Sequence, residues 1–498
     1  MVHPTSLHSL PQDSQMTNEI DHVRDPLNRS TSETSPNLLD IMIADARPKG
    51  SGARPLTIPT PQSAPIRDGK PDAPMSMDAS KPCPASPMYQ SYIETFAEQM
   101  YDPKVLGDLN KLRNKYNCEI AQGGSPVDFA RKVFAEDDDP YTAIFTPEQF
   151  GKMVETQKGK DVGSGVVLRI PSQAEEASGQ PQRLIVQEFE ATPGRTQRLE
   201  PGDEVLAVGN ENLKGKSWRE ALKFFDGKEN SEFDVKVLRN GKEQTVRLKR
   251  TSEELPAATS SMVDNDSFAH IRLRTFMQDD ASAELEREVL AHPNAKGFIL
   301  DLRHNSGGLL DQAFTSASVF MKEGDALTIR QRERSDPANP VYKNVTYRVS
   351  PTEIQKIQDG GNPVPYMARH ADRVDKPVVV LTDQGTASAA EILAGALKDS
   401  DGAYVIGTQT YGKGIGQSVI SDWTTGGALK MTTFHYFTPN GNWPGDGHHR
   451  RIGLKPDLFV ASPAPQFYGT AQDGQLNAAI QFLRNKTAID NTQPFKHN

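Results

Sequence analysis

The chain is poor in the residues that several classes of protein need. Its 498 residues include only two cysteines, Cys83 and Cys118, which supply neither a disulfide framework nor a set of metal ligands. One disulfide is compatible with that number, but Cys83 lies in a segment that we predict to be disordered, which argues against the bond. No apolar run approaches the roughly 20 residues that a membrane-spanning helix needs. Acidic residues outnumber basic ones, 65 to 56, so no basic excess favours binding to nucleic acid.

The N-terminal part of the chain also lacks apolar periodicity. Residues 1–86 are rich in proline, serine and aspartate, and such a segment cannot bury enough apolar surface to offset the entropy of ordering. Composition therefore predicts a disordered tail over residues 1–86. The first residues have neither the basic nor the apolar region of a signal peptide.

A helical pattern follows the tail, over residues 87–158. Apolar residues recur at helical spacing in residues 92–101, and the Asp102-Pro103 pair ends that helix. Two further helices are predicted, over about residues 105–116 and 126–134. This segment is expected to be scaffold rather than a source of catalytic groups.

The next segment, residues 159–252, carries the turns and strands of a small β domain. A strand follows a glycine-rich turn at Ser164, Gly165 and Val166, a Pro-Gly-Asp turn comes next, and Asn240-Gly241 is typical of a type I′ hairpin turn. The combination resembles a PDZ domain. In such a domain a peptide adds a strand to the open sheet edge, and backbone N–H groups of the glycine-rich turn hold its terminal carboxylate. The alternative is a PDZ-like spacer that binds nothing.

Residues 253–470 alternate between strand and helix patterns. After a polar linker at residues 251–262, buried-type strands and apolar helices follow one another at about residues 270–276, 281–290, 297–302, 309–320, 377–382, 391–397 and 403–407. This alternation predicts an α/β core. We interpret residues 330–375 as a polar, irregular surface excursion with short strands and residues 471–498 as a closing helix and tail.

One stretch of this core contains a serine and a lysine suited to acyl-transfer chemistry. Ser388 precedes an apolar helix, and Lys413 lies between two glycines 25 residues later. A serine hydroxyl needs an adjacent base to become a nucleophile, and a lysine can be that base when burial keeps it neutral. The pair alone is weak evidence, because an N-cap serine and a surface lysine would give the same pattern.

Backbone N–H groups that could bind an oxyanion are predicted in two places. The Ala389 N–H lies at the start of the helix that follows Ser388, and the strand–glycine turn–helix at residues 297–320 brings further N–H groups to a helix start. The Gly307-Gly308 pair in that turn could instead bind phosphate, but it lacks the spacing of a dinucleotide or P-loop motif.

Three motifs together resemble one family of peptidases. They are TASAAE at residues 386–391 followed by YGKGIGQ at 411–417, DLRHNSGG at 301–308, and IGLKPD at 452–457. The combination is similar to the C-terminal processing peptidases, also called tail-specific proteases (type S41), which are PDZ-containing serine peptidases with a Ser–Lys catalytic pair. The resemblance covers roughly residues 89–483. It departs from the family pattern at Ala390, His304 and Ser306, none of which the chemistry needs.

The resemblance implies a role for each matching residue. Ser388 would be the nucleophile, Lys413 the general base, and Gln417 the glutamine that holds the lysine by a hydrogen bond. The N–H groups of Gly308 and Ala389 would form the oxyanion hole. The implied fold is a crotonase-like or ClpP-like α/β protease core with an inserted PDZ domain and an N-terminal helical segment, and no metal or cofactor is implied.

The implied function is that of a serine endopeptidase that captures substrate C-termini through its PDZ domain. Expected partners are proteins or peptides with exposed C-termini, without nucleic acid and without an integral membrane segment, and a homo-oligomer is compatible with the sequence. Members of the family usually work in the periplasm or another extracytoplasmic compartment. Because no signal peptide is evident, a different start, unconventional export and retention inside the cell all stay open.

Other interpretations remain open on the sequence. His270, His304 and His435 are scattered along the core, so spacing alone does not exclude a Ser–His–Asp triad. The His448-His449 pair is interpreted as part of a loop, because no carboxylate lies at ligand spacing. Asp399 matches an aspartate of some family members, and we expect it to cap structure rather than act in catalysis. A non-catalytic PDZ adaptor and a crotonase-like acyl-CoA enzyme are the two rival functions.

Overall fold

The computed structural model describes most of the chain after the predicted tail. The described residues are 82–135, 139–171, 175–176, 178, 180–189, 199–333, 336–370, 374–422 and 425–490. All of them belong to one unit of the chain, Ser35–Asn498. The predicted tail lies outside the described residues except for its last five.

A six-stranded sheet lies at the centre of the C-terminal part of the chain. Its strands, in spatial order, are β10 (Ala258–Val263), β11 (Phe268–Leu273), β12 (Phe298–Asp301), β17 (Val378–Thr382), β18 (Tyr404–Gly407) and β21 (Leu458–Phe459). β11 to β21 are parallel, and β10 is antiparallel to β11. Three helices connect the parallel strands: α8 (Ala281–Leu290), α9 (Leu310–Phe320) and α10 (Ala389–Asp401). The prediction of an α/β core is confirmed.

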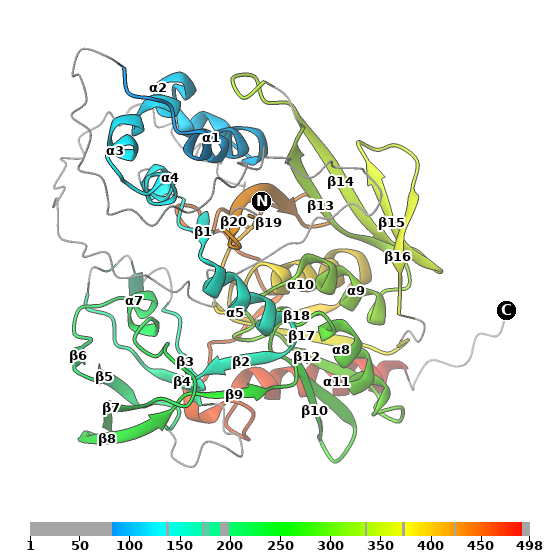
Figure 1. Ribbon diagram of the computed structural model, residues 1–498. Coiled ribbons are helices and arrows are strands. Elements are labelled where there is room, and N and C mark those ends of the chain that lie inside the picture. The colour runs from blue at the N-terminus through cyan, green and yellow to red at the C-terminus, as the bar shows by residue number, and fades with distance from the viewer. Residues whose placement is uncertain are drawn as a thin grey trace, which may run out of the picture. The chain divides into compact units, whose positions relative to one another are not determined.

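Both faces of this sheet are buried, which explains why its strands are almost wholly apolar. Along β17, Val378 and Val380 belong to the apolar cluster of α8, α9 and α10, whereas Val379 and Leu381 belong to the cluster of α11 (Gly474–Asp490). Figure 1 shows α9 and α10 on one side of the sheet and α11 on the other. Burying each such side chain stabilises the fold by roughly 1.5–3 kcal/mol.

A second sheet, entirely antiparallel, packs over α9 and α10. Its strands, in spatial order, are β1 (Ala143–Phe145), β20 (Ala428–Phe437), β13 (Gly324–Arg332), β14 (Tyr342–Val349), β15 (Glu353–Gln358) and β16 (Val364–Ala368), and β19 (Ile415–Ser421) also pairs with β20. The strands expected within residues 330–375 are present, but the interpretation of the region as irregular was wrong, because they are regular strands of this sheet. Polar residues alternate there with Val345, Tyr347 and Val349, whose side chains are buried in the core cluster, so this is a strand pattern with one wet face.

The N-terminal helical segment is more divided than its apolar spacing suggests. It consists of α1 (Pro87–Gln99), η2 (Pro103–Leu106), α2 (Leu109–Asn114), α3 (Asn117–Ala121) and α4 (Pro126–Ala135), and after β1 comes α5 (Pro147–Gln157). The single helix predicted over residues 105–116 was wrong. Asp108 interrupts it as an N-cap, because its side chain accepts hydrogen bonds from the N–H groups of Asn110 and Lys111.

Cys83 and Cys118 form a disulfide bond, which corrects the sequence-based argument against one. The reason lies in the start of α1. Ser86 is the N-cap of this helix, and its backbone N–H donates to Asn117 Oδ1 at 3.3 Å. The residues just before α1 are therefore held against α3, where Cys118 lies, although their composition resembles that of the preceding tail.

Residues 160–254, which we call the insert, form a separate group of strands and one helix around their own apolar core. It contains β2 (Lys160–Gly163), β3 (Val166–Leu168), β4 (Val186–Phe189), β5 (Glu204–Val208), β6 (Glu211–Asn212), α7 (Trp218–Leu222), β7 (Glu232–Arg239), β8 (Lys242–Lys249) and β9 (Thr251–Glu254). Asn240 and Gly241 both have positive φ, 51° and 76°, as a type I′ turn requires. The polar linker predicted at residues 251–262 was wrong, because β9 pairs with β2 and β10 pairs with β11.

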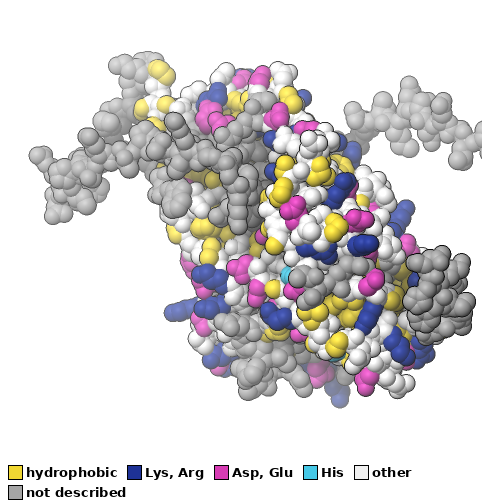
Figure 2. Space-filling view, turned by 90° about the vertical axis from the view of Figure 1, so that its right-hand side faces the viewer, with side chains coloured by type: hydrophobic (Ala, Val, Ile, Leu, Met, Phe, Trp, Pro, Cys, Tyr) yellow, Lys and Arg dark blue, Asp and Glu magenta, His cyan; other side chains and the backbone are white. Residues whose placement is uncertain are grey.

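The surface carries charges of both signs. Figure 2 shows lysine and arginine side chains interspersed with aspartate and glutamate on the face that it presents, so this face has no field of one sign. In the part of the chain that the structure describes, no helix combines the length and the apolar character needed to cross a membrane.

Candidate active site

Ser388 lies where the chain turns from β17 into α10. It is the N-cap of α10 and has φ 50° and ψ −115°, an unusual backbone conformation for a residue other than glycine. Holding such a residue costs about 1–3 kcal/mol, so the surroundings must impose it. The Ser388 N–H donates to Glu391 Oε2 at 2.9 Å, and the residue is 8% exposed. The candidate nucleophile is thus fixed by its own helix and is largely buried.

Asp383 organises the turn before the serine. Its Oδ1 accepts hydrogen bonds from the N–H groups of His304, Gly385 and Thr386 at 2.9, 2.9 and 3.1 Å. Burial by itself raises the pKa of a carboxyl group, but the adjacent His304 more than offsets this and holds the pKa of Asp383 below its usual value. Asp383 is therefore a carboxylate, and it holds the turn by accepting these three hydrogen bonds.

Lys413 is buried beside the same helix. It is 1% exposed, and its amine lies over the Tyr141 ring, 4.0 Å from the ring centroid. The Tyr141 hydroxyl donates to the Gly447 carbonyl at 2.7 Å, which fixes the ring above the lysine. The lysine is thus withdrawn from open solvent, although it forms no hydrogen bond with Ser388 Oγ in this structure.

Glu391 connects the serine to the lysine. Its Oε2 accepts from the N–H groups of Ser388 and Lys413, both at 2.9 Å, so these two nitrogens lie no more than about 6 Å apart. Its Oε1 accepts from the Gly412 N–H at 2.9 Å and from Thr410 Oγ1 at 2.5 Å. Burial raises the pKa of Glu391, and these donors oppose the rise. The sequence analysis missed this role, although a glutamate three residues after an N-cap serine is a capping-box signal.

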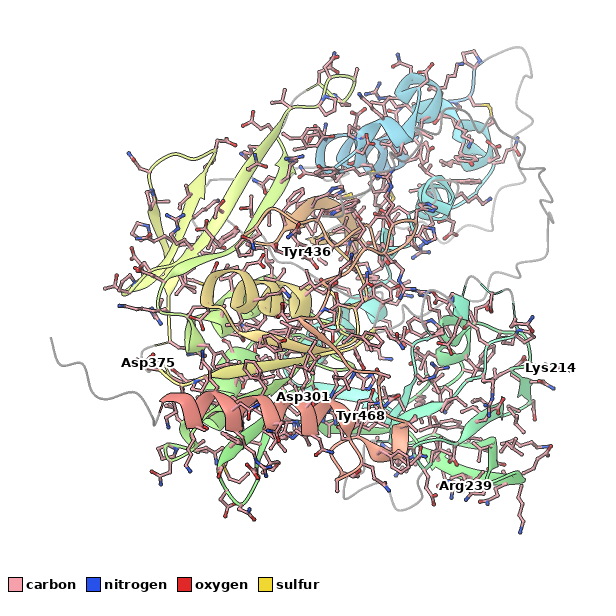
Figure 3. The ribbon with its side chains drawn as sticks, turned by 180° about the vertical axis from the view of Figure 1, so that it is seen from behind. Lys214, Arg239, Asp301, Asp375, Tyr436 and Tyr468 are labelled. Atoms are coloured by element: carbon pink, nitrogen blue, oxygen red, sulfur yellow. A yellow bond between two sulfur atoms is a disulfide. The ribbon has the colours of Figure 1, made fainter. Side chains whose placement is uncertain are left out.

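Tyr436, on β20, was also missed. Its hydroxyl hydrogen-bonds to the Lys413 carbonyl, and it lies 3.2 Å from the Ser388 carbonyl and 3.4 Å from Glu391 Oε2. Burial, reinforced by Glu391, raises the pKa of Tyr436 well above its usual value, so the phenol stays protonated and can donate. Tyr436 is labelled in Figure 3.

The hydrogen bond predicted between Gln417 and Lys413 is absent from this structure. The Gln417 side chain is fully buried on β19, and its Nε2 donates to Thr432 Oγ1 at 3.2 Å. Its Oε1 accepts no hydrogen bond within the described residues. The β19–β20 pairing has a register shift between Gly416 and Gln417, an irregularity that spacing alone could not reveal.

The two predicted oxyanion donors lie on turns that share a partner. Asn305 accepts from the Ala387 N–H through its carbonyl oxygen at 3.0 Å and from the Gly307 N–H through Oδ1 at 2.9 Å. The turn before Gly308 and the turn before Ser388 are therefore held together. Within the described residues, no hydrogen bond uses the N–H groups of Gly308 or Ala389.

The predicted carboxylate-binding turn of the insert precedes β3. Ser164 is buried, Gly165 has φ 74°, and Val166 begins the strand. Among the described strands β3 pairs only with β4, which leaves its other edge unpaired. These residues line neither of the cavities described below.

The histidines have partners other than Ser388. His270 Nε2 lies 3.0 Å from Asp301 Oδ2, His304 Nδ1 lies 2.8 Å from Asp383 Oδ2, and His435 stacks on Tyr101. No described histidine hydrogen-bonds to Ser388, so the geometry offers no Ser–His–Asp triad. His448-His449 lies in a loop, as predicted, and the described residues contain no cluster arranged to hold a metal ion.

Asp399 has a structural role, as the sequence analysis expected. It does not cap its own helix but binds groups of the segment that follows β20. Its Oδ2 accepts from Thr438 Oγ1 at 2.6 Å and from the Asn440 N–H at 3.1 Å. It therefore ties the last turns of α10 to the segment that follows β20.

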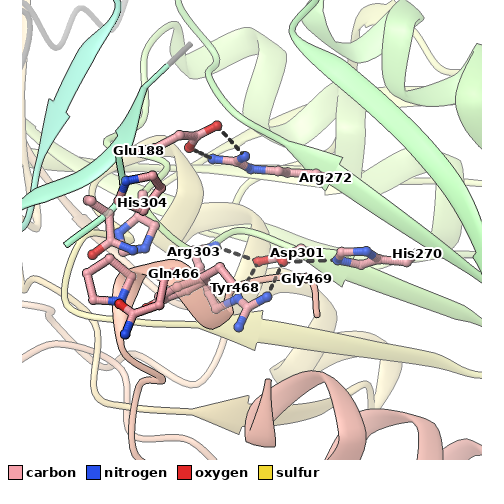
Figure 4. A pocket seen from close by; sticks show the side chains of 12 residues that line it. Glu188, His270, Arg272, Asp301, Arg303, His304, Gln466, Tyr468 and Gly469 are labelled. Atoms are coloured by element: carbon pink, nitrogen blue, oxygen red, sulfur yellow. Dashed lines mark hydrogen bonds and ion pairs between the residues drawn. The ribbon is translucent and has the colours of Figure 1, made fainter. Parts of the chain in front are cut away.

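A cleft made of two adjoining cavities, about 210 and 480 Å³, separates the insert from the core. Both are lined by Gln187, His304, Pro465 and Tyr468. Figure 4 shows the ion pairs in the smaller one: Glu188 of the insert with Arg272 of the core, and Asp301 with Arg303 and His270. Burial by itself would raise the pKa of Asp301, but the Arg303 guanidinium and the hydrogen bond with His270 hold it well below the usual range. In Figure 3, Asp301 and Tyr468, which line this cleft, lie apart from Tyr436, which contacts the candidate catalytic residues.

The insert also contacts the segment that carries the lysine. Ala387 and Tyr411, the neighbours of Ser388 and Gly412, belong to the apolar cluster built around Trp218 of the insert. Arg219 of α7 donates a hydrogen bond to the Tyr411 hydroxyl. Packing in the insert is therefore directly linked to both turns of the candidate site.

Comparisons with known proteins place this geometry in a family. Residues 267–460 match the model of Peptidase family S41. The chain is 30% identical over 369 residues to a probable CtpA-like serine protease of Staphylococcus aureus (strain COL), covering 72% of this chain and 66% of that protein. It is 29% identical over 373 residues to a carboxyl-terminal-processing protease of Synechocystis sp. (strain ATCC 27184 / PCC 6803 / Kazusa), covering 72% and 77%. The chain belongs to peptidase family S41.

A solved structure supports the same assignment at the level of the fold. A photosystem II D1 C-terminal processing protease aligns with a TM-score of 0.52 at 24% identity, covering 80% of this chain and 97% of that one. This S41 peptidase therefore has the mixed α/β fold of its relatives, and those relatives include serine proteases and carboxyl-terminal-processing proteases. It aligns with about two thirds of the length of its staphylococcal relatives.

Proposed function

We propose that this S41 peptidase is an endopeptidase that cleaves peptide bonds with Ser388 as nucleophile and Lys413 as its base. The observation that carries the proposal is that one buried carboxylate oxygen, Glu391 Oε2, accepts from the backbone N–H groups of both residues. The buried setting of the lysine adds to it, because burial favours the neutral form of an amine, the form that acts as a base.

In this mechanism the Lys413 amine takes the proton of Ser388 Oγ while the hydroxyl attacks the scissile carbonyl carbon. The amine first moves from the face of the Tyr141 ring towards the serine. The N–H groups of Gly308 and Ala389 stabilise the oxyanion of the tetrahedral intermediate. The protonated lysine then donates its proton to the leaving amine and, once neutral again, activates the water that hydrolyses the acyl-enzyme.

Gln417 enters the cycle after the proton has moved. A protonated lysine in a buried site needs an acceptor, and the Gln417 Oε1 atom is buried and accepts no hydrogen bond from a described residue. We assign Gln417 the role of binding the charged form of Lys413.

The insert is proposed to be a PDZ domain that captures the C-terminus of the substrate. Among the described strands β3 pairs only with β4, which leaves an edge for an added strand, and the turn at Ser164, Gly165 and Val166 precedes that edge, where N–H groups can bind a carboxylate. The cleft between insert and core reaches Gln384, four residues before Ser388, and offers a path for the captured chain. The core itself is proposed to be of the crotonase-like or ClpP-like type.

Ser388→Ala and Lys413→Ala are each expected to abolish cleavage of an unstructured protein substrate while leaving the circular dichroism spectrum unchanged. Ser400→Ala and Lys398→Ala on the last turns of α10 are the matched controls, and they should keep wild-type activity. Activity should rise with pH as the catalytic lysine loses its proton. Retained activity of Lys413→Ala, or a rate controlled by a group titrating near pH 6 to 7, would contradict the lysine assignment.

Two substrates that differ only in their last residues test the capture step. The one with an apolar C-terminus should be cleaved at a lower KM than the one with a charged C-terminus. Binding of the apolar end without any cleavage would instead indicate the adaptor function.

A further inference from the structure

The Glu391 carboxylate has no part in the mechanism above, yet it is fully buried at the centre of the site. Burying a carboxylate is costly unless it is well hydrogen-bonded. Here two backbone N–H groups bind Oε2, and a third together with a threonine hydroxyl binds Oε1. These four contacts are thus with the backbone of the two candidate catalytic turns and with Thr410, and the Tyr436 hydroxyl makes a longer one, 3.4 Å from Oε2.

The donors come from two segments that are remote in sequence. The Ser388 N–H belongs to the turn before α10, whereas the N–H groups of Gly412 and Lys413 belong to the segment before β19. No other described side chain accepts from both segments. The carboxylate therefore joins the N–H groups of the two turns, while the Tyr436 hydroxyl joins the carbonyl groups of Ser388 and Lys413.

We propose that Glu391 is a positioning residue, whose carboxylate sets the distance and orientation of Ser388 and Lys413 relative to each other without touching the substrate. The inference rests on the proposed function. Thr410 takes part, because its Oγ1 accepts from the Leu454 N–H at 2.7 Å and so directs its own proton to Glu391 Oε1.

Glu391→Gln tests the proposal with little change in shape. A carboxamide has a single acceptor oxygen, so whichever way it is oriented its NH₂ group faces donors that the carboxylate accepted. We expect kcat on an unstructured protein substrate to fall about 100-fold, as for a displacement of about 1 Å between reacting groups. KM should change by less than about 3-fold, because no substrate contact is lost.

A fluorophosphonate probe gives a second readout, since it reports the nucleophilicity of Ser388 without involving the insert. Its rate of labelling Ser388 should fall in parallel with kcat in Glu391→Gln. The matched control is Asp473→Asn, because Asp473 is also buried and accepts from three backbone N–H groups, those of Gly469, Gln475 and Leu476. This control should lose stability but keep kcat and the labelling rate.

The outcomes separate this inference from the proposed function. A folded Glu391→Gln protein with wild-type kcat and labelling rate would overturn the positioning role alone. If the wild type shows neither Ser388-dependent cleavage nor labelling, both the function and the inference are overturned. If Glu391→Gln does not fold, Thr410→Val serves instead. It removes one donor to the carboxylate and should slow labelling about 10-fold, whereas an unchanged rate would count against the proposal.

Discussion

His435 shows, at the scale of one residue, how packing decides charge. It is the neighbour of Tyr436 on β20, and its ring stacks on Tyr101 with the ring centroids 3.8 Å apart and on Trp443 at 5.2 Å. Burial between these rings, together with the nearby Arg330, lowers the pKa of His435 to about 4. The imidazole is therefore neutral in the folded protein at every pH at which the enzyme is expected to work.

This burial predicts a loss of stability in mild acid. The unfolded chain takes up a proton on His435 near its ordinary pKa of about 6.5, whereas the folded chain does so only near 4, so the stability is present above pH 6.5 and falls as the pH drops from about 6.5 to 4. The loss should reach about 3 kcal/mol. Urea unfolding at pH 7 and pH 4.5 measures this loss. In His435→Phe, which keeps the stacking, the free energy of unfolding should differ less between the two pH values. An equal difference in both proteins would contradict the neutral buried form.

At the scale of elements, the turn between β12 and α9 leaves no room for a side chain at Gly308. The residue has φ 148°, and a Cβ atom there would lie 2.1 Å from the Phe276 carbonyl carbon and 2.3 Å from the Met277 nitrogen. Both are backbone atoms that cannot rotate away. The close approach is what allows Phe276 to accept from the Leu309 N–H at 2.7 Å and hold the turn.

Gly308→Ala should therefore destabilise the protein by at least about 2 kcal/mol and abolish cleavage, because it displaces a proposed oxyanion donor. Gly151→Ala is the matched control. Gly151 lies in α5, and an added Cβ would meet nothing within 4 Å. The control should gain about 0.5–1 kcal/mol from helix propensity. Thermal and urea unfolding measure both changes, and a Gly308→Ala protein as stable as the wild type would show that the turn can relax.

At the scale of the whole molecule, the disulfide anchors the N-terminal segment. It joins residues 35 positions apart, Cys83 and Cys118, just before α1 and within α3. α1 in turn packs on the second sheet, since residues of both belong to one apolar cluster. The bond therefore restrains the chain at the boundary between the described residues and the preceding 81.

Replacing both cysteines by serine should lower the free energy of unfolding by up to about 4 kcal/mol, the chain-entropy value for a loop of this length. Dithiothreitol should lower the stability of the wild type by the same amount and leave the double variant unchanged. Denaturant unfolding with and without reductant makes the comparison. If reduction is complete by thiol titration and stability does not change, the bond does not restrain the unfolded chain as expected.

The sequence by itself determined the features that depend on local pattern. Strands buried on both faces are apolar throughout, as β12 and β17 are, and the helices between them have apolar stripes, so the α/β alternation could be predicted. The Asn240-Gly241 turn was predictable because few other residue pairs adopt two positive φ angles. The family motifs around Ser388 and Lys413 led to the same S41 assignment as the comparisons.

Only the tertiary structure decided which remote groups meet. Cys83 reaches Cys118 because α1 is anchored on α3. Gln417 donates to Thr432 rather than bonding to the lysine, while Glu391 joins two turns that are far apart in sequence. Such contacts depend on the relative placement of whole elements, which comes from the packing of the complete core and leaves no periodic signal in the local sequence.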